Sequence, residues 1–184
     1  MSLSSYRRNV QAGATGQWHN TCFPSALEQI SPDHELLPHH YRRYERGIRA
    51  LDKLYSQGGQ AKRQVNPVAR AMFNDIFVPL GCSIDDVEFR RVRHAYGLKR
   101  LVASAMRQGC RVAVDLDLRI QNASHPVGLL ELVDGRFTLM SNHVPPGLKV
   151  TTLDELFLHV DQPKERHSTR YPFADSNVTI LPPS

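Results

Sequence analysis

Three residues of this chain, Cys22, His125 and Asn142, have the types and the order of a thiol-based catalytic site. Cys22 begins a run in which apolar residues recur at helical spacing. Its thiol is therefore expected at a helix N-terminus, where the helix dipole favours the thiolate. His125 opens one apolar run, Asn142 follows a second, and the Asp134-Gly135 pair between them is typical of a two-residue β-hairpin turn. Such a hairpin would bring His125 and Asn142 close together.

These side chains together can carry out nucleophilic catalysis. The thiolate of Cys22 would attack a carbonyl carbon, His125 would act as base and then as acid, and the Asn142 side chain would orient the imidazole. The tetrahedral oxyanion needs hydrogen-bond donors, and the backbone N–H of Cys22 and the side-chain amide of Gln17 are suitable. This chemistry requires no cofactor, and none is expected.

The remaining cysteines and histidines have simpler interpretations. Cys82 and Cys110 are expected to be structural, and His143 ranks second to His125 as the base, with His159 as a further substitute. The histidines and carboxylates of residues 33–40 lack a fixed ligand spacing, so they are expected to form a solvated loop and not a metal site.

Hydrophobic periodicity predicts helices first and then an antiparallel sheet, which is an α+β fold. Asn66-Pro67 is a strong helix start, and Thr152 with Glu155 forms a possible capping box. The expected helices are 22–30, 38–56, 66–77, 96–108 and 152–159, and the expected strands are 87–92, 110–118, the two strands of the hairpin and an edge strand at 177–181.

The length of 184 residues favours one domain. Residues 1–16 are expected to be a flexible arm, followed by a single domain over 17–184. Its helical half would span about 17–108 and its sheet half about 109–184.

The chain is basic, with a formal charge of +5 and a pI near 9.3. Its arginine clusters are interpreted as solvated helix faces, so nucleic acid is an unlikely partner. No apolar run is long enough to span a membrane and no signal peptide is visible, so the expected location is cytoplasmic, or secreted by a route that needs no signal peptide. Three widely spaced cysteines do not predict a disulfide framework. The oligomeric state is not predicted.

The order of Gln17, Cys22, His125 and Asn142 resembles that of papain-like cysteine hydrolases, closest to the bacterial branch that contains the double-glycine leader peptidases. The likeness covers residues 17 to about 160, although residues 31–95 match no known pattern. It implies a papain-like fold in which the cysteine helix packs on a C-terminal antiparallel sheet, with Cys22 as nucleophile, His125 as base, Asn142 as orienting residue and Gln17 as oxyanion donor.

The sequence departs from that branch at several positions. Phe23 stands where those peptidases usually have glycine, Asn142 where they usually have aspartate, and Gln17 lies one residue nearer to the cysteine. The stretch around Cys22 is also similar to ovarian-tumour-type deubiquitinases, but their Asp-Gly pair before the cysteine is absent.

The sequence therefore predicts a thiol hydrolase or acyltransferase that acts on a peptide, isopeptide or amide bond of a protein or peptide substrate. Its size and the missing signal suggest a delivered bacterial effector. Two alternatives stay open. The first is a catalytically silent binding or adaptor domain on the same scaffold, in which Phe23 crowds the cleft. The second is a basic nucleic-acid-binding protein.

Overall fold

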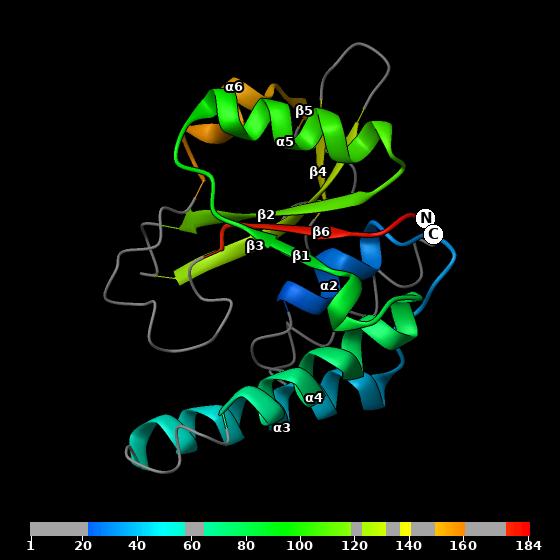
Figure 1. Cartoon of the computed structure of the whole chain (residues 1–184), viewed down its shortest axis with the longest axis vertical. Helices are drawn as coiled ribbons and strands as arrows, with labels where there is room; N and C mark the ends of the chain where they lie inside the picture. Colours follow the sequence, from blue (N-terminus) through cyan, green and yellow to red (C-terminus); the bar gives the residue numbers. More distant parts are fainter. Residues whose placement is uncertain (1–21, 58–64, 119–122, 132–136, 141–149, 161–175) are drawn as a thin grey trace.

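The computed structural model describes residues 22–57, 65–118, 123–131, 137–140, 150–160 and 176–184 of the chain (Figure 1). Helices and an antiparallel sheet make up this part, so the predicted α+β class is confirmed. In chain order the elements are α2 (Cys22–Gln29), α3 (Pro38–Gln57), α4 (Val65–Phe77), the 3-10 turns η2 (Val78–Leu80) and η3 (Ile84–Asp86), β1 (Glu88–Arg90), α5 (Ala95–Arg107), β2 (Arg111–Leu118), β3 (Ala123–Glu131), β4 (Phe137–Met140), β5 (Val150–Thr151), α6 (Leu153–Phe157) and β6 (Val178–Leu181).

The sheet has six strands in the order β1-β6-β2-β3-β4-β5, and every neighbouring pair is antiparallel. The prediction that residues 177–181 form an edge strand is wrong, because β6 lies between β1 and β2. All four residues of β6 are buried. Its apolar residues cover both faces of the sheet, and a strand buried on both faces belongs in the interior.

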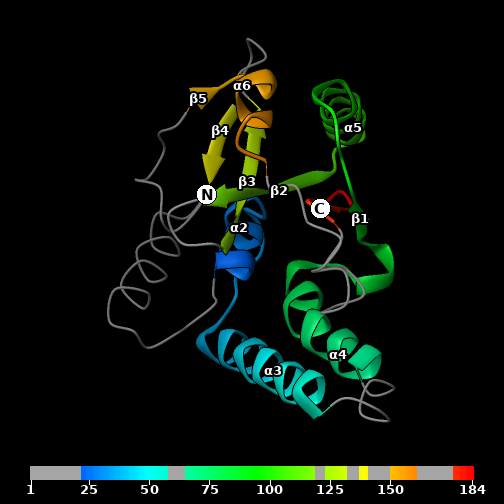
Figure 2. The same ribbon diagram turned by 90° about the vertical axis from the view of Figure 1, so that its left-hand side faces the viewer.

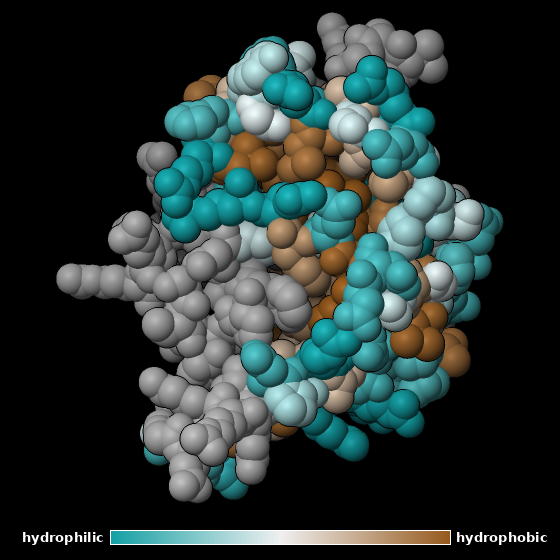
Figure 3. Space-filling model, viewed as in Figure 1, coloured by the Kyte–Doolittle hydropathy of each residue, from teal (hydrophilic) through white to brown (hydrophobic). Residues whose placement is uncertain are grey.

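Helices cover both faces of this sheet. Figures 1 and 2 show α2 against one face with α3 and α4 outside it, and α5 and α6 against the other face. Although α5 belongs to the expected helical half, it therefore lies across the sheet from the other long helices. Figure 3 shows apolar atoms gathered between the two helical layers, with hydrophilic atoms above and below them.

Two hydrophobic cores correspond to these two faces. The core on the α2 side contains the buried faces of α3 and α4 and receives Ala113 and Leu181 from the sheet. The core on the α5 side contains Val127 and Leu129 of β3 together with the apolar stripe of α5. Because alternate residues of a strand face opposite sides, β2 and β6 contribute side chains to both cores.

The hairpin of β3 and β4 exists, but its register differs from the prediction. A two-residue turn at 134–135 would pair Leu130 with Leu139, whereas the structure pairs Leu129 with Leu139. Burial decides this register, because Leu129 and Leu139 are both buried in the core on the α5 side, and a shift by one residue would put them on opposite faces. Asp134 and Gly135 themselves lie outside the described residues.

Most helix predictions are confirmed to within one or two residues. For α6 the predicted capping box is present, since the Thr152 side chain accepts from the Glu155 backbone and the Glu155 side chain accepts from the Thr152 backbone. The prediction that Asn66 caps this helix is wrong. The helix α4 already begins at Val65, so Asn66 lies inside it and Pro67 lies in its first turn. Within the described ranges, no helix is both long enough and apolar enough to cross a membrane.

The helix α2 lies in tight contact with the sheet at Gly128 of β3. A Cβ atom at this position would lie 2.9 Å from the backbone oxygen of Ala26 and would also overlap the Ile30 side chain. Backbone cannot move aside as a flexible side chain can, so only glycine lets α2 lie this close to β3.

We predict that Gly128→Ala lowers the free energy of unfolding by about 1–3 kcal/mol, because the added methyl group forces α2 away from the sheet. Denaturant-induced unfolding followed by circular dichroism measures the change. Gly97→Ala in α5 is the matched control, since its new methyl group would lie 3.4 Å from Val92 and alanine is favoured in a helix. Equal stability of Gly128→Ala and the parent protein would contradict this account of the packing.

Candidate functional site

Cys22 is the first residue of α2, as the sequence predicts, and its side chain is half-buried. Residues four positions apart share a helix face, so Cys22 lies one turn before Ala26 on the face that meets β3 at Gly128. All three cysteines of the chain are reduced. The structure thus presents a thiol at a helix N-terminus beside the sheet, which is the position a thiolate nucleophile requires.

Two effects act on the pKa of the Cys22 thiol. Burial raises this pKa and is the larger effect, and a hydrogen bond from the backbone N–H of Cys22 itself lowers it. The helix alone therefore does not make Cys22 a thiolate at neutral pH. A cationic or basic partner close to the sulfur is needed to activate it.

A buried carboxylate fixes the position of α2 relative to α3. Glu28 accepts a hydrogen bond from the Leu36 backbone N–H at 2.8 Å and another from the Tyr41 hydroxyl. Both Glu28 and Tyr41 are almost fully buried. A buried carboxylate that lost these donors would be strongly destabilising, so this contact ties the cysteine helix to the helical layer.

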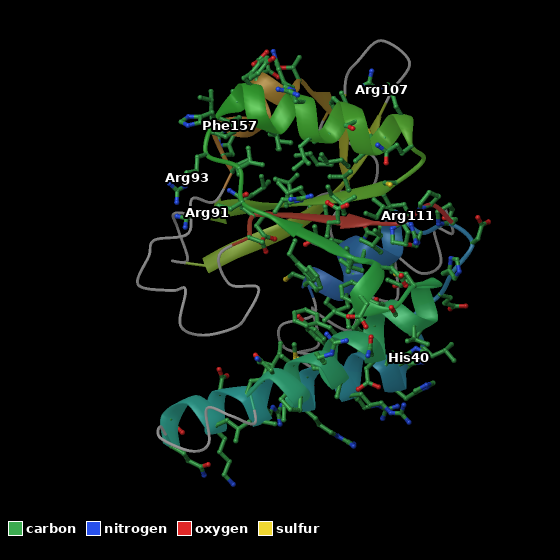
Figure 4. The ribbon with its side chains drawn as sticks, in the orientation of Figure 1. His40, Arg91, Arg93, Arg107, Arg111 and Phe157 are labelled. Atoms are coloured by element: carbon green, nitrogen blue, oxygen red, sulfur yellow. The ribbon has the colours of Figure 1, made fainter. Side chains whose placement is uncertain are left out.

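The far end of α2 is held by Arg111, a buried arginine that the sequence analysis did not single out. Its Nη1 donates to the Ser31 hydroxyl at 2.7 Å and to the Leu80 carbonyl at 3.1 Å, and its Nε donates to the Pro182 carbonyl at 3.1 Å. Figure 4 shows Arg111 where β2 meets the end of α2. Burial lowers the pKa of this guanidinium. Arg111 joins the sheet, α2, η2 and the C-terminal segment at one point.

Phe23, the residue that departs from the family pattern, points into the helical layer. Its ring lies 6.3 Å from Tyr44, 5.9 Å from Phe73 and 6.3 Å from Phe77, measured between centroids. These rings belong to α3 and α4. Because Phe23 packs away from the face that Cys22 shares with Ala26, it gives no support to a cleft blocked by an aromatic side chain.

The start of β3 lies on the same side of the molecule as Cys22. Figures 1 and 2 show α2 and β3 beginning on this side. His125 is in β3, opposite Leu116 of β2, and its side chain is outside the described part. The last residue of β4, Met140, pairs with Gly128, so β4 ends beside the strand that carries His125. Asn142 and Gln17 lie outside the described residues.

The register brings one more segment to this edge of the sheet. Arg90, Val178, Val114 and Val127 form one row across β1, β6, β2 and β3, so the chain leaving β1 passes the edge at which β3 begins. The side chain of Asn177 clamps this segment, accepting from the Val92 N–H at 2.8 Å and donating to the Val92 carbonyl at 2.9 Å.

Asn177 is fully buried, although the sequence predicts it only as the start of a strand. Val92 is separated from it by 85 positions, so no local pattern could reveal the clamp. Figure 4 shows Arg91 and Arg93, which flank Val92, at this side of the molecule.

The other candidates take structural places. Cys82 is buried with its thiol directed at the Phe77 carbonyl, 3.6 Å away, and burial raises its pKa. Cys110 is half-buried just before β2, and burial raises its pKa as well. His40 accepts from the Leu37 N–H at 3.0 Å. Among the residues that the structure describes, no three histidine, cysteine or carboxylate side chains are placed to hold a metal ion.

Comparisons with protein-family models, with curated proteins and with solved structures found no match to this chain. The α+β fold and the placement of Cys22, β3 and β4 are therefore the features that bear on its function.

We predict that Phe23→Ala lowers the free energy of unfolding by about 2–4 kcal/mol, somewhat less than for a fully buried ring, because it removes the contacts with the rings of α3 and α4. Chemical denaturation measures the loss, and Phe23→Leu, which keeps an apolar side chain, should retain most of the stability. Alkylation of Cys22 in the folded Phe23→Ala protein should be no faster than in the parent. Faster alkylation at unchanged stability would show that Phe23 covers the thiol.

Proposed function

We propose that this protein is a papain-like thiol hydrolase or acyltransferase, with Cys22 as its nucleophile and His125 as its base. The observation that carries the proposal is the position of Cys22, at the first residue of α2 and on the helix face that packs against β3. A cysteine helix lying on an antiparallel sheet is the arrangement that the family resemblance implies. Asn142 as orienting residue and Gln17 as oxyanion donor belong to the same proposal.

The pKa of Cys22 supports the need for a base. Burial holds the thiol in its protonated form, so an imidazole must take its proton before attack. The proton passes from Sγ to the imidazole, the thiolate adds to the carbonyl carbon, and the imidazolium then protonates the leaving amine. Water or an acceptor amine releases the acyl group from the sulfur.

The strand register sets a condition on the choice of base. Gly128 faces α2, whereas Leu116, the partner of His125 across the sheet, packs against the core on the α5 side. Regular alternation along the whole of β3 would assign position 125 to the side of Leu116. The pairing of β3 with β2 is continuous from Leu129 through Pro126 to Ala123, so contact between His125 and Cys22 requires this end of β3 to rearrange. If His125 does not reach Cys22, His143 is the alternative base.

The substrate proposed is a peptide, isopeptide or amide bond of a protein, and the delivered-effector role stays a proposal drawn from the sequence. The alternative of a catalytically silent adaptor was motivated by Phe23. Since Phe23 packs among the rings of α3 and α4, that motivation is removed.

We predict that Cys22 is the fast-reacting thiol of the folded protein. Iodoacetamide should alkylate Cys22 before Cys82 and Cys110, as located by peptide mass spectrometry, and Cys22→Ala should abolish the fast phase together with any amide hydrolysis. Cys110→Ala is the matched control and should leave the fast phase unchanged. A fast phase that survives in Cys22→Ala and disappears in Cys110→Ala would contradict the proposal.

The pH dependence of the same reaction identifies the base. Alkylation requires the thiolate, so its rate falls as the pH drops below the effective pKa of Cys22. Replacing the base removes its lowering effect on this pKa while burial, the larger of the two remaining effects, still raises it, so the midpoint should move to higher pH. We expect this shift in His125→Ala and not in His143→Ala. A shift only in His143→Ala would transfer the role to His143, and no shift in either would exclude both His125 and His143 as the base.

A further inference from the structure

We propose that α3 docks this protein on an anionic phospholipid bilayer, a function separate from the chemistry of Cys22. The proposal concerns a row of four cations on α3, formed by Arg42, Arg46, Arg49 and Lys53 and here called the cation row. Successive members are three or four positions apart, so they lie along one face of the helix. All four side chains are exposed. At the rise of an α-helix the cation row is roughly 16 Å long.

Most of the charge in the cation row is not neutralised by neighbouring carboxylates. Arg49 pairs with Glu45 at 2.8 Å, and the Nε of Arg42 reaches only the Pro38 carbonyl, at 3.4 Å. In the described ranges no carboxylate lies within ion-pair distance of Arg42, Arg46 or Lys53. On the flank towards α4, by contrast, Arg43 faces Asp75 at 3.6 Å. Within the part of the chain that the structure describes, three cations without an ion-pair partner therefore project from one exposed helix face.

The cation row lies at an outer end of the molecule. Figures 1 and 2 place α3 farthest from α5 and α6, and Figure 4 shows side chains with nitrogen tips pointing outward from its lower side. The helix is straight over this length, so the whole row can meet a flat surface at once. Docking through α3 would not use the edge of the sheet beside Cys22.

The surroundings of the row favour a bilayer over single-stranded nucleic acid. Proteins that bind single strands stack bases on exposed aromatic rings. Tyr41 and Tyr44 of α3 are buried on the opposite side of the helix, so neither ring can stack a base beside the row. A negatively charged bilayer requires only positive charge near its surface.

The apolar face of α3 is already used inside the protein. Tyr41, Tyr44 and Leu51 belong to the core on the α2 side, so α3 would lie on the headgroups without inserting into the acyl region. Binding should consequently be electrostatic and should weaken steeply as salt shortens the screening length.

Flotation with vesicles tests the proposal on the full-length protein. We expect binding to phosphatidylcholine vesicles that contain about a quarter phosphatidylserine, and none to phosphatidylcholine alone. The row variant Arg42→Gln/Arg46→Gln/Lys53→Gln should bind on the order of 100-fold more weakly, at roughly fivefold per cation. Glutamine is a good helix former, so these exposed changes should leave the fold intact by circular dichroism.

The control variant Arg93→Gln/Arg100→Gln/Arg107→Gln removes the same charge from the other end of the molecule. Figure 4 shows Arg93 and Arg107 away from α3. This variant and Cys22→Ala should bind the vesicles nearly as well as the parent. The proposal is overturned by an absence of binding to anionic vesicles, by equal losses in the row and control variants, or by row-dependent binding to DNA or RNA in place of vesicles.

Discussion

The helix that carries Cys22 is buried on both sides, and the arrangement of the protein follows from this constraint. Every residue from Pro24 to Gln29 is buried, with the sheet on one side of α2 and the aromatic rings of α3 and α4 on the other. Only the two ends of a short helix in this position can be exposed to solvent. The Cys22 thiol is at the N-terminal end, and Arg111 occupies the C-terminal end.

Each contact of α2 limits a different motion. Gly128 permits the close approach to β3, Glu28 links the helix to α3, and Arg111 joins its end to β2 and to the C-terminal segment. Phe23 completes the packing towards the helical layer. A thiol held in this way keeps one orientation relative to the sheet, which is the condition that the proposed attack on a bound carbonyl requires. The burial that fixes Cys22 also raises its pKa, so rigidity and the need for a base have the same physical origin.

Local patterns were sufficient to predict the elements but not their neighbours. The periodicity of α2, α3, α5 and β2 is contained in consecutive residues, and the capping box of α6 spans only four. The interior place of β6 and the register of β3 with β4 depend on which faces become buried, and consecutive residues do not contain that information.

The contacts of Arg111 and Asn177 join residues 80 and 85 positions apart. Of the site itself, the sequence could locate Cys22 at a helix start, because a helix start is a local feature. The side of the sheet to which His125 belongs is a tertiary property and needed the register.

The most direct test of the central claim is the titration of the His125 ring, followed by NMR in the parent protein and in Cys22→Ala. A thiolate beside an imidazolium stabilises the charged ring, so the account predicts a higher pKa for His125 in the parent than in Cys22→Ala. A His125 titration with the same midpoint in both proteins would contradict the pairing of Cys22 with His125.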